Sequence, residues 1–141
     1  MERVKISANF FLDEYIPKDL YLKYASKSWI LLGLIDSRLI QADQMLRNVF
    51  GSVTINSWWN GGDRQWSGLR LPASPDYSLT SQHSYGRGSD KLFKHPASEV
   101  REYIKLYWKE LGITCIEDNV SWIHSDVRAL QNPNELLIVI P

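Results

Sequence analysis

Residues 81–90 constrain the fold more than any other stretch of the chain, because they cannot lie within a helix. They read SQHSYGRGSD, and Gly86 and Gly88 would each weaken a helix interior. His83 and Asp90, seven positions apart, must therefore meet across a turn if they meet at all. An imidazole nitrogen and a carboxylate oxygen are both ligands that zinc accepts. The segment is either a turn with a capping aspartate or one part of a metal site.

A metal site needs a third ligand, and the chain has only three histidines. His95 comes directly before a proline and a predicted helix, so we interpret it as an exposed residue and not as a ligand. His124 lies at 121–128, SWIHSDVR, which has the pattern of a strand. Three protein ligands that leave a fourth position for water are typical of catalytic zinc. The hypothesis is a mononuclear zinc site made by His83, Asp90 and His124.

The same residues resemble a known family. The pattern S-x-H-x-x-G-x-small-x-D at 81–90, followed by WIHSDVR at 122–128, is similar to the zinc D-alanyl-D-alanine carboxypeptidases, whose phage members include cell-wall endopeptidases. The similarity extends to TINSWWNGG at 54–62, SGLR at 67–70 and NFF at 9–11. It implies a zinc carboxypeptidase or endopeptidase of the Hedgehog/DD-peptidase fold. The implied substrate is a peptidoglycan stem peptide that contains D-amino acids.

The resemblance also implies roles for residues beside the metal. In the related enzymes an arginine after a Ser-Gly step faces the substrate, and Arg70 matches that position. Its planar guanidinium suits a carboxylate, although a solvated arginine or a surface ion pair would be the simpler interpretation without the resemblance. Tyr85 and Trp122 are expected to flank the substrate groove.

A base must take a proton from water and pass it to the leaving amine. Related enzymes often carry an acid three residues before the last histidine, where this chain has Ser121. Glu117 is the first candidate, because a turn at Asn119 and Val120 would pair it with Trp122 and put it on the same face as His124 and Asp126. A register shifted by one residue would present Asp118 instead. Asp126 is the second candidate, and its expected role is to hold a neighbouring side chain.

The remaining pattern predicts a single domain, residues 1–141, of the α+β class. Helices are expected at 17–24, 37–49 and 95–112, and strands at 53–58, 113–116, 121–127 and 136–140. We expect the helices to pack on a small antiparallel sheet, with a central strand at 53–58 and a last strand buried on both faces. The helix at 37–49 is expected to serve the core and to carry no chemistry.

Composition narrows the possible functions. The single cysteine, Cys115, lies in an apolar run and is expected to be buried, not nucleophilic. Sixteen basic residues balance sixteen acidic ones, so we expect no nucleic-acid partner. No apolar run is long enough for a membrane helix, and the N-terminus does not read as a signal peptide. We expect a soluble monomer, made in the cytoplasm, that reaches the cell wall after lysis or in a phage particle.

Two other functions stay open. A noncatalytic binding or virion-structural domain would keep the fold and even the metal without turnover. A metal-dependent phosphodiesterase would need a second metal and more clustered acids than the sequence contains. Six tryptophans and seven tyrosines suit a carbohydrate or peptide groove, but they suit a hydrophobic core as well.

Overall fold

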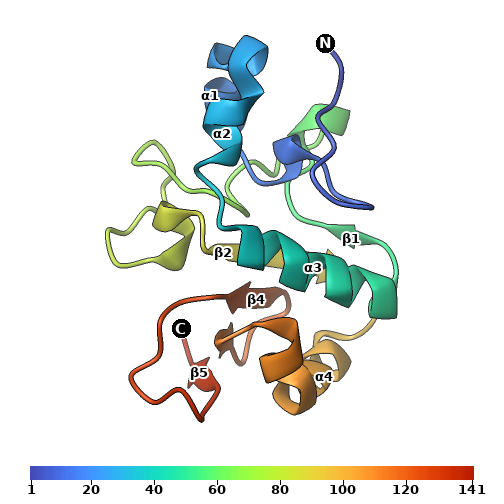
Figure 1. Ribbon diagram of the computed structural model, residues 1–141, viewed down its shortest axis with the longest axis vertical. Helices are drawn as coiled ribbons and strands as arrows, with labels where there is room; N and C mark the ends of the chain where they lie inside the picture. The colour runs from blue at the N-terminus through green and yellow to red at the C-terminus, as the bar shows by residue number, and fades with distance from the viewer.

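A five-stranded sheet with helices packed against it forms the centre of the protein (Figure 1). The computed structural model describes all residues, Met1–Pro141. The strands, in the spatial order β1-β2-β4-β3-β5, are β1 Val53–Thr54, β2 Gly88–Phe93, β4 Ile123–Asp126, β3 Cys115–Glu117 and β5 Leu137–Val139. The α-helices are α1 Lys18–Lys23, α2 Ser28–Leu32, α3 Ser37–Phe50 and α4 Ala97–Leu111. Four short 3-10 helices are η1 Leu12–Glu14, η2 Ala25–Lys27, η3 Trp58–Asn60 and η4 Gln82–Tyr85.

The α+β class is confirmed, but the sheet is mixed and not antiparallel as expected. The pairs β1–β2, β2–β4 and β3–β4 are antiparallel, whereas β5 runs parallel to β3. The reason is that β2 already occupies the other edge of β4. The last strand therefore adds to the free edge of β3, and the loop after β4 brings it back in the direction of β3.

Two predictions about strand position were wrong. β1 is a two-residue edge strand and not a central one. The expected strand ends early because the backbone N–H of Asn56 turns away to bond the carbonyl of Glu14. β5 lies at the opposite edge, with Leu137 and Ile138 41% and 43% exposed, so it is not buried on both faces. An apolar run predicts a doubly buried strand only where a layer covers each side.

The predicted helices form where the sequence supplies a start and a stop. Asp36 caps α3 by accepting a hydrogen bond from the backbone N–H of Arg38, and Gly51 follows its last residue. Helix α4 begins after Pro96 and ends at Gly112. Helix α1 begins after Pro17.

Strand alternation gives the sheet two different faces. Ile116 of β3 and Ile123 of β4 point toward α3 and α4, where they join a buried core. The remaining members of that core are Ala42, Leu46, Val100, Ile104, Leu111 and Ile113. Their strand neighbours Glu117 and His124 therefore point to the opposite face. We call this second face the open face, and the face under the helices the closed face.

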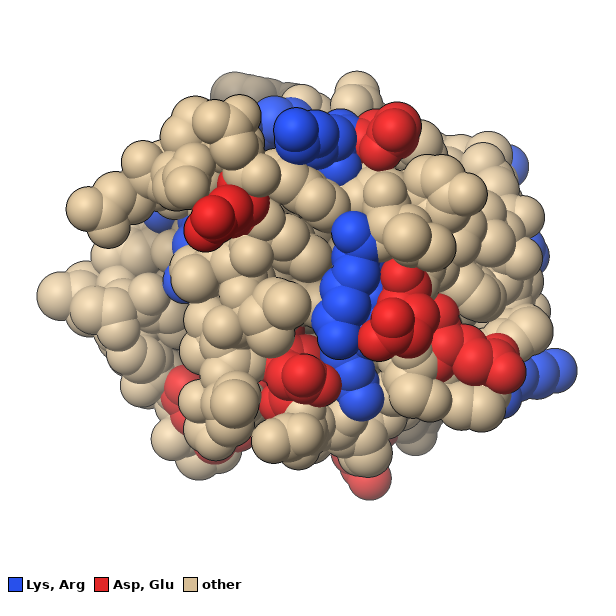
Figure 2. Space-filling view, turned by 90° about the horizontal axis from the view of Figure 1, so that it is seen from below, with Lys and Arg blue, Asp and Glu red and all other residues tan.

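The surface carries both charges in close proximity. Seen from the end where α4 and β5 lie, a narrow band of basic side chains runs beside several acidic ones (Figure 2). This mixture agrees with the formal net charge of zero. None of the helices is long and apolar enough to cross a membrane.

Candidate metal centre

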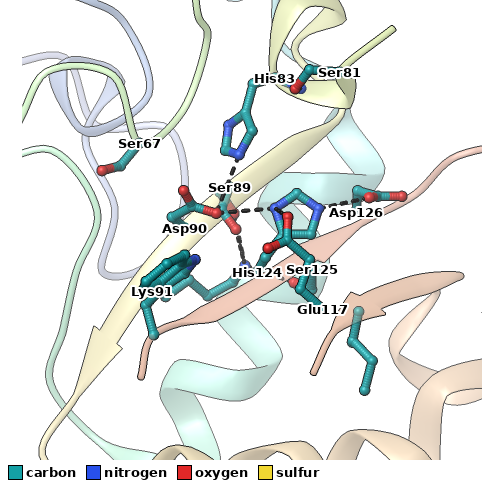
Figure 3. A network of polar contacts seen from close by, with 12 residues as sticks. Ser67, Ser81, His83, Ser89, Asp90, Lys91, Glu117, His124, Ser125 and Asp126 are labelled. Atoms are coloured by element: carbon teal, nitrogen blue, oxygen red, sulfur yellow. Dashed lines mark hydrogen bonds and ion pairs between the residues drawn. The ribbon is translucent and has the colours of Figure 1, made fainter. Parts of the chain in front are cut away.

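The three predicted ligands meet on the open face (Figure 3). Asp90 of β2 and His124 of β4 are direct partners in the antiparallel register, and His83 reaches them from η4. One oxygen of Asp90, Oδ1, lies 3.2 Å from Nε2 of His83 and 3.0 Å from Nδ1 of His124. The three ligand atoms all lie within 4.8 Å of one another. Ligand atoms around a tetrahedral zinc ion are about 3.3 Å apart, so this cluster has nearly the size that a metal needs.

Glycines at two positions allow this approach. His83 lies in a single 3-10 turn, which Ser81 caps and Gly86 ends with a left-handed φ of 67°. A Cβ at Gly86 would collide with the carbonyl oxygen of Leu34. A Cβ at Gly88 would come within 3.2 Å of Cε1 of His124. The two glycines that exclude a helix thus also make room for the turn and for the imidazole.

Each imidazole is held from behind through its second nitrogen. Nδ1 of His83 lies 2.8 Å from the carbonyl oxygen of Gly68, and Nε2 of His124 lies 2.7 Å from Oδ2 of Asp126. Since a carbonyl or a carboxylate only accepts, these nitrogens carry the protons of the neutral rings. The lone pairs of the other two nitrogens then face Asp90. Metal-binding histidines are oriented in this way.

Asp126 is a support for His124 and lies outside the cavity. It is fully buried, and Arg128 bonds both of its oxygens, with distances of 2.8 Å and 2.6 Å. Burial raises the pKa of Asp126, but the hydrogen bonds from Arg128 and His124 outweigh it and bring the pKa to about 2. Asp126 therefore stays ionised and keeps the proton of the neutral imidazole on Nε2. This is the holding role that was predicted.

The charges of the cluster favour a cation. Burial raises the pKa of Asp90, yet its contacts with His124 and His83 outweigh burial and hold that pKa well below the usual range. Burial lowers the pKa of His124, and its hydrogen bonds to Asp126 and Asp90 reverse this and raise the pKa to about 9. The two carboxylates thus attract positive charge to the point between the ligands. A metal ion would replace the proton on His124.

A cavity of about 600 Å³ opens on this point. Its wall includes His83, Asp90 and Glu117, so two of the ligands and a further carboxylate are reached from one space. Trp122 also lines it and is 36% exposed, as expected for a groove residue. Tyr85 does not: it lies in a different, smaller pocket, and its hydroxyl donates to a backbone carbonyl.

Besides Asp90, the cavity wall carries the carboxylates of Asp63, Asp76 and Glu117, and Glu117 is the one that lies beside a histidine of the cluster. The β3–β4 register puts it opposite His124, and its Oε1 lies 3.6 Å from Nδ1 of that ring. The predicted pairing of Glu117 with Trp122 was wrong by two residues, but a shift of two keeps every side chain on the same face. Asp118 points elsewhere, with an oxygen 3.5 Å from Nε of Arg101. The register that was left open is thus resolved in favour of Glu117.

Arg70 lies in the cavity wall, but its side-chain partner is the candidate ligand Asp90. Its Nη2 donates to Oδ2 of Asp90 at 3.0 Å, and its Nε donates to the carbonyl oxygen of Trp66 at 3.0 Å.

Cys115 and His95 have the predicted surroundings. Burial raises the pKa of the Cys115 thiol to about 12. His95 is exposed, and its Nδ1 lies 3.3 Å from a carboxylate oxygen of Glu99.

Sequence reasoning missed a second polar cluster, on the closed face. Asp43 of α3 forms an ion pair with Lys91 of β2 at 2.9 Å, and both side chains are fully buried. Helix α3 therefore carries a buried charge and is not only apolar on its inner side. Asp43 falls among the apolar positions Leu39, Ile40 and Leu46 of that helix, and a charge on an apolar stripe is the signal that was available.

Comparison of the chain with protein-family models, with curated proteins and with solved structures found no match. The assignment of a function therefore rests on the geometry of the centre and on the motif resemblance.

Proposed function

We propose that this protein is a zinc-dependent peptidase of the Hedgehog/DD-peptidase fold that hydrolyses a peptide bond in peptidoglycan stem peptides. One observation carries the proposal: two imidazole nitrogens and one carboxylate oxygen converge beside a cavity whose wall includes His83 and Asp90, and each imidazole is held by an acceptor on its far side. A site with two nitrogens and one oxygen, open on one side, is the ligand set of catalytic zinc.

The side chains around the centre support hydrolysis. Zinc would polarise the scissile carbonyl and make water acidic near neutral pH. Glu117, in the same cavity wall, would take the proton of the attacking water and return it to the leaving amine. Trp122 offers an apolar surface to the substrate beside it. Asp126 would keep His124 in the tautomer that binds through Nδ1.

The substrate class comes from the motif resemblance and includes two reactions. A carboxypeptidase would release a terminal D-Ala, and an endopeptidase would cut within the stem peptide or its cross-link. We propose action at the cell wall after lysis or delivery in a phage particle, as a monomer. Digestion of purified peptidoglycan followed by mass spectrometry of the fragments tests this, because the two reactions give different masses. No released fragment from any wall type would contradict the proposal.

Metal content is the direct test of the centre. We expect one zinc per chain by elemental analysis of the desalted protein, and loss of that zinc in His83→Ala and His124→Ala. His95→Ala is the matched control, since His95 is exposed and contacts Glu99 and not the cluster, and this variant should keep its zinc. Zinc-free wild type, or full zinc content in both ligand variants, would refute the site.

A second candidate is a noncatalytic binding or virion-structural domain with the same fold. The observation that favours it is Ser121, which lies in the cavity wall where related enzymes often carry their acid. The two candidates separate on turnover. One bound zinc with no hydrolysis of any muropeptide would favour the binding domain, whereas hydrolysis that depends on Glu117 would favour the peptidase.

A further inference from the structure

We infer that Arg70 is a positioning residue of the metal centre: it holds one oxygen of Asp90, so that Asp90 presents only the other oxygen to the metal. This inference rests on the proposed function, because it assigns a role at the same centre. It also changes the role that the motif resemblance implies for Arg70, which is contact with the substrate.

The two oxygens of Asp90 have separate partners. Oδ1 faces Nε2 of His83 and Nδ1 of His124, at 3.2 Å and 3.0 Å. Oδ2 faces away from both rings and accepts the hydrogen bond from Nη2 of Arg70. The side chains of Arg70 and Asp90 are only 16% and 14% exposed, so little water competes for this contact. Oδ1 is the oxygen that remains for a metal.

Arg70 is itself fixed by the backbone around it. Its Nε is bonded to the carbonyl of Trp66, and its own backbone N–H donates to the carbonyl of His83 at 2.9 Å. A guanidinium that is bonded to a carbonyl through Nε and to a carboxylate through Nη2, on an anchored backbone, presents a rigid donor. The orientation of Asp90 is therefore set by the fold and not by the metal alone.

The whole segment 67–70 contacts the ligands. The carbonyl of Ser67 accepts from the backbone N–H of Asp90 at 2.7 Å, and the carbonyl of Gly68 holds the ring of His83. Gly68 is required because a Cβ there would lie 2.5 Å from the carbonyl oxygen of Tyr15. Successive residues of this SGLR segment thus orient the ligand from η4 and the ligand from β2. Arg70 is the side-chain part of that support.

This arrangement leaves Arg70 poorly suited to a substrate carboxylate. Its charge is balanced by Asp90 in direct contact, and the Nε edge of its guanidinium is bonded to Trp66. A two-pronged contact with a second carboxylate would compete with the contact to the metal ligand. A substitution of Arg70 should therefore change the metal before it changes substrate recognition.

The test compares Arg70→Met and Arg70→Lys with wild type in two measurements that need no substrate. Zinc affinity is measured by competition with a chelator, and the environment of the metal by the visible absorption of the cobalt(II)-loaded protein. Arg70→Met should weaken zinc binding about tenfold to a hundredfold and alter the cobalt spectrum, because Oδ2 of Asp90 becomes free to turn toward the metal. Arg70→Lys should recover part of the affinity, since an ammonium group can still bond one oxygen.

Arg64→Met is the matched control. Arg64 lines the same cavity but bonds the carbonyl of Ile55 and the hydroxyl of Ser67, and it contacts no ligand side chain. It should leave the cobalt spectrum unchanged.

Two outcomes would overturn the inference. Zinc affinity and cobalt spectrum unchanged in Arg70→Met, with a higher KM for peptides that end in a carboxylate, would return Arg70 to substrate binding. A lower melting temperature with unchanged zinc affinity would make its role structural. Wild type that binds zinc but hydrolyses nothing would refute the peptidase and leave the Arg70 measurements valid, whereas wild type that binds no zinc would refute both.

Discussion

The two faces of the sheet use neighbouring residues of the same strands for opposite purposes. On β2, Asp90 points to the open face and Lys91 to the closed one; on β4, His124 and Ser125 divide in the same way (Figure 3). Both faces therefore carry buried charge within one residue of each other. The two faces differ in whether that charge is neutralised by other groups of the protein.

On the closed face the buried charge is balanced within the protein. The ammonium group of Lys91 contacts Asp43 at 2.9 Å, and it donates to Ser125 Oγ at 2.6 Å and to Ser89 Oγ at 2.8 Å. Oδ2 of Asp43 accepts from Tyr15 at 2.8 Å and from Ser89 at 2.7 Å. One positive and one negative charge cancel, and the donors of Lys91 all have acceptors within reach.

The open face has the opposite character. Asp90 and Asp126 are held there by Arg70 and Arg128, yet two imidazole nitrogens and one Asp90 oxygen lie within 4.8 Å of one another. A structural ion pair and a ligand site therefore differ in how their polar groups are paired. A structural pair satisfies every donor internally, whereas a ligand site aims several acceptors at one place and supports each of them from behind.

The sharpest contrast is expected for Glu117→Gln, which should abolish most activity and leave the fold intact. The amide keeps the size and the hydrogen bonding of Glu117 but not its basicity. We expect the rate of peptide hydrolysis to fall by about a hundredfold to ten-thousandfold, with zinc content and melting temperature near wild type.

Asp118→Asn is its control, because Asp118 faces Arg101 and not the cavity. It should retain the wild-type rate. A fully active Glu117→Gln protein together with an inactive Asp118→Asn protein would assign the base to Asp118 and contradict the register.

On the closed face, Lys91→Met should destabilise the folded protein. It leaves the carboxylate of Asp43 buried without its cation, and we expect the free energy of unfolding to fall by about 3–5 kcal/mol. Chemical denaturation measures this, with Glu117→Gln as the comparison on the open face.

The double variant Lys91→Met/Asp43→Asn removes both charges and keeps an acceptor for Tyr15 and Ser89. It should be more stable than Lys91→Met alone, because no uncompensated charge remains. Lys91→Met within about 1 kcal/mol of wild type would show that this pair is not what stabilises the closed face.

Asp126→Asn tests the support behind the open face. The amide preserves the shape of Asp126 but weakens its hold on Nε2 of His124 and its pairing with Arg128. Zinc affinity, measured by chelator competition, should fall about tenfold to a hundredfold. Unchanged affinity would mean that the histidine is oriented without Asp126.

Much of the fold follows from local signals in the sequence. The ends of α3 were predictable from Asp36 and Gly51. The side-chain face of Glu117 was not, because strand alternation alone left Glu117 and Asp118 as alternatives until the β3–β4 register was known. The position of each strand in the sheet was not predictable, because an apolar run such as 136–140 does not indicate which strand edge it pairs with. The parallel pairing of β5 depends on which edge was free after β2 had paired with β4.

The three candidate ligands were predictable from the sequence, whereas the groups that support them were not. His83, Asp90 and His124 stand in short motifs with characteristic spacing, whereas the carbonyl of Gly68 leaves no trace in the sequence. The pairing of Arg70 with Asp90 was also not predictable, since Asp90 is twenty positions away and had been predicted to bind the metal. Contacts between distant segments decide which acid an arginine meets.

The smallest effect concerns Glu14, a half-buried carboxyl group that has neither kind of support. Its Oε2 accepts from the backbone N–H of Phe11 at 2.8 Å, but the nearby guanidinium of Arg3 bonds Asp13 instead. Burial without a paired cation raises the pKa of Glu14 to about 7.

Because this pKa lies above its unfolded value of 4.5, the folded protein binds the extra proton between those values. The contribution of Glu14 to stability is therefore full below pH 4.5 and lost as the pH rises through about 7. Glu14→Gln keeps the acceptor for Phe11 and cannot ionise. It should match wild type at pH 4.5 and be more stable at pH 8, by about 1 kcal/mol since the carboxyl is partly exposed. Thermal melts at both pH values measure this, with the exposed Glu110→Gln as control. An equal difference at the two pH values would show that folding does not shift the pKa of Glu14, and so that its position in the fold does not disfavour the ionised form.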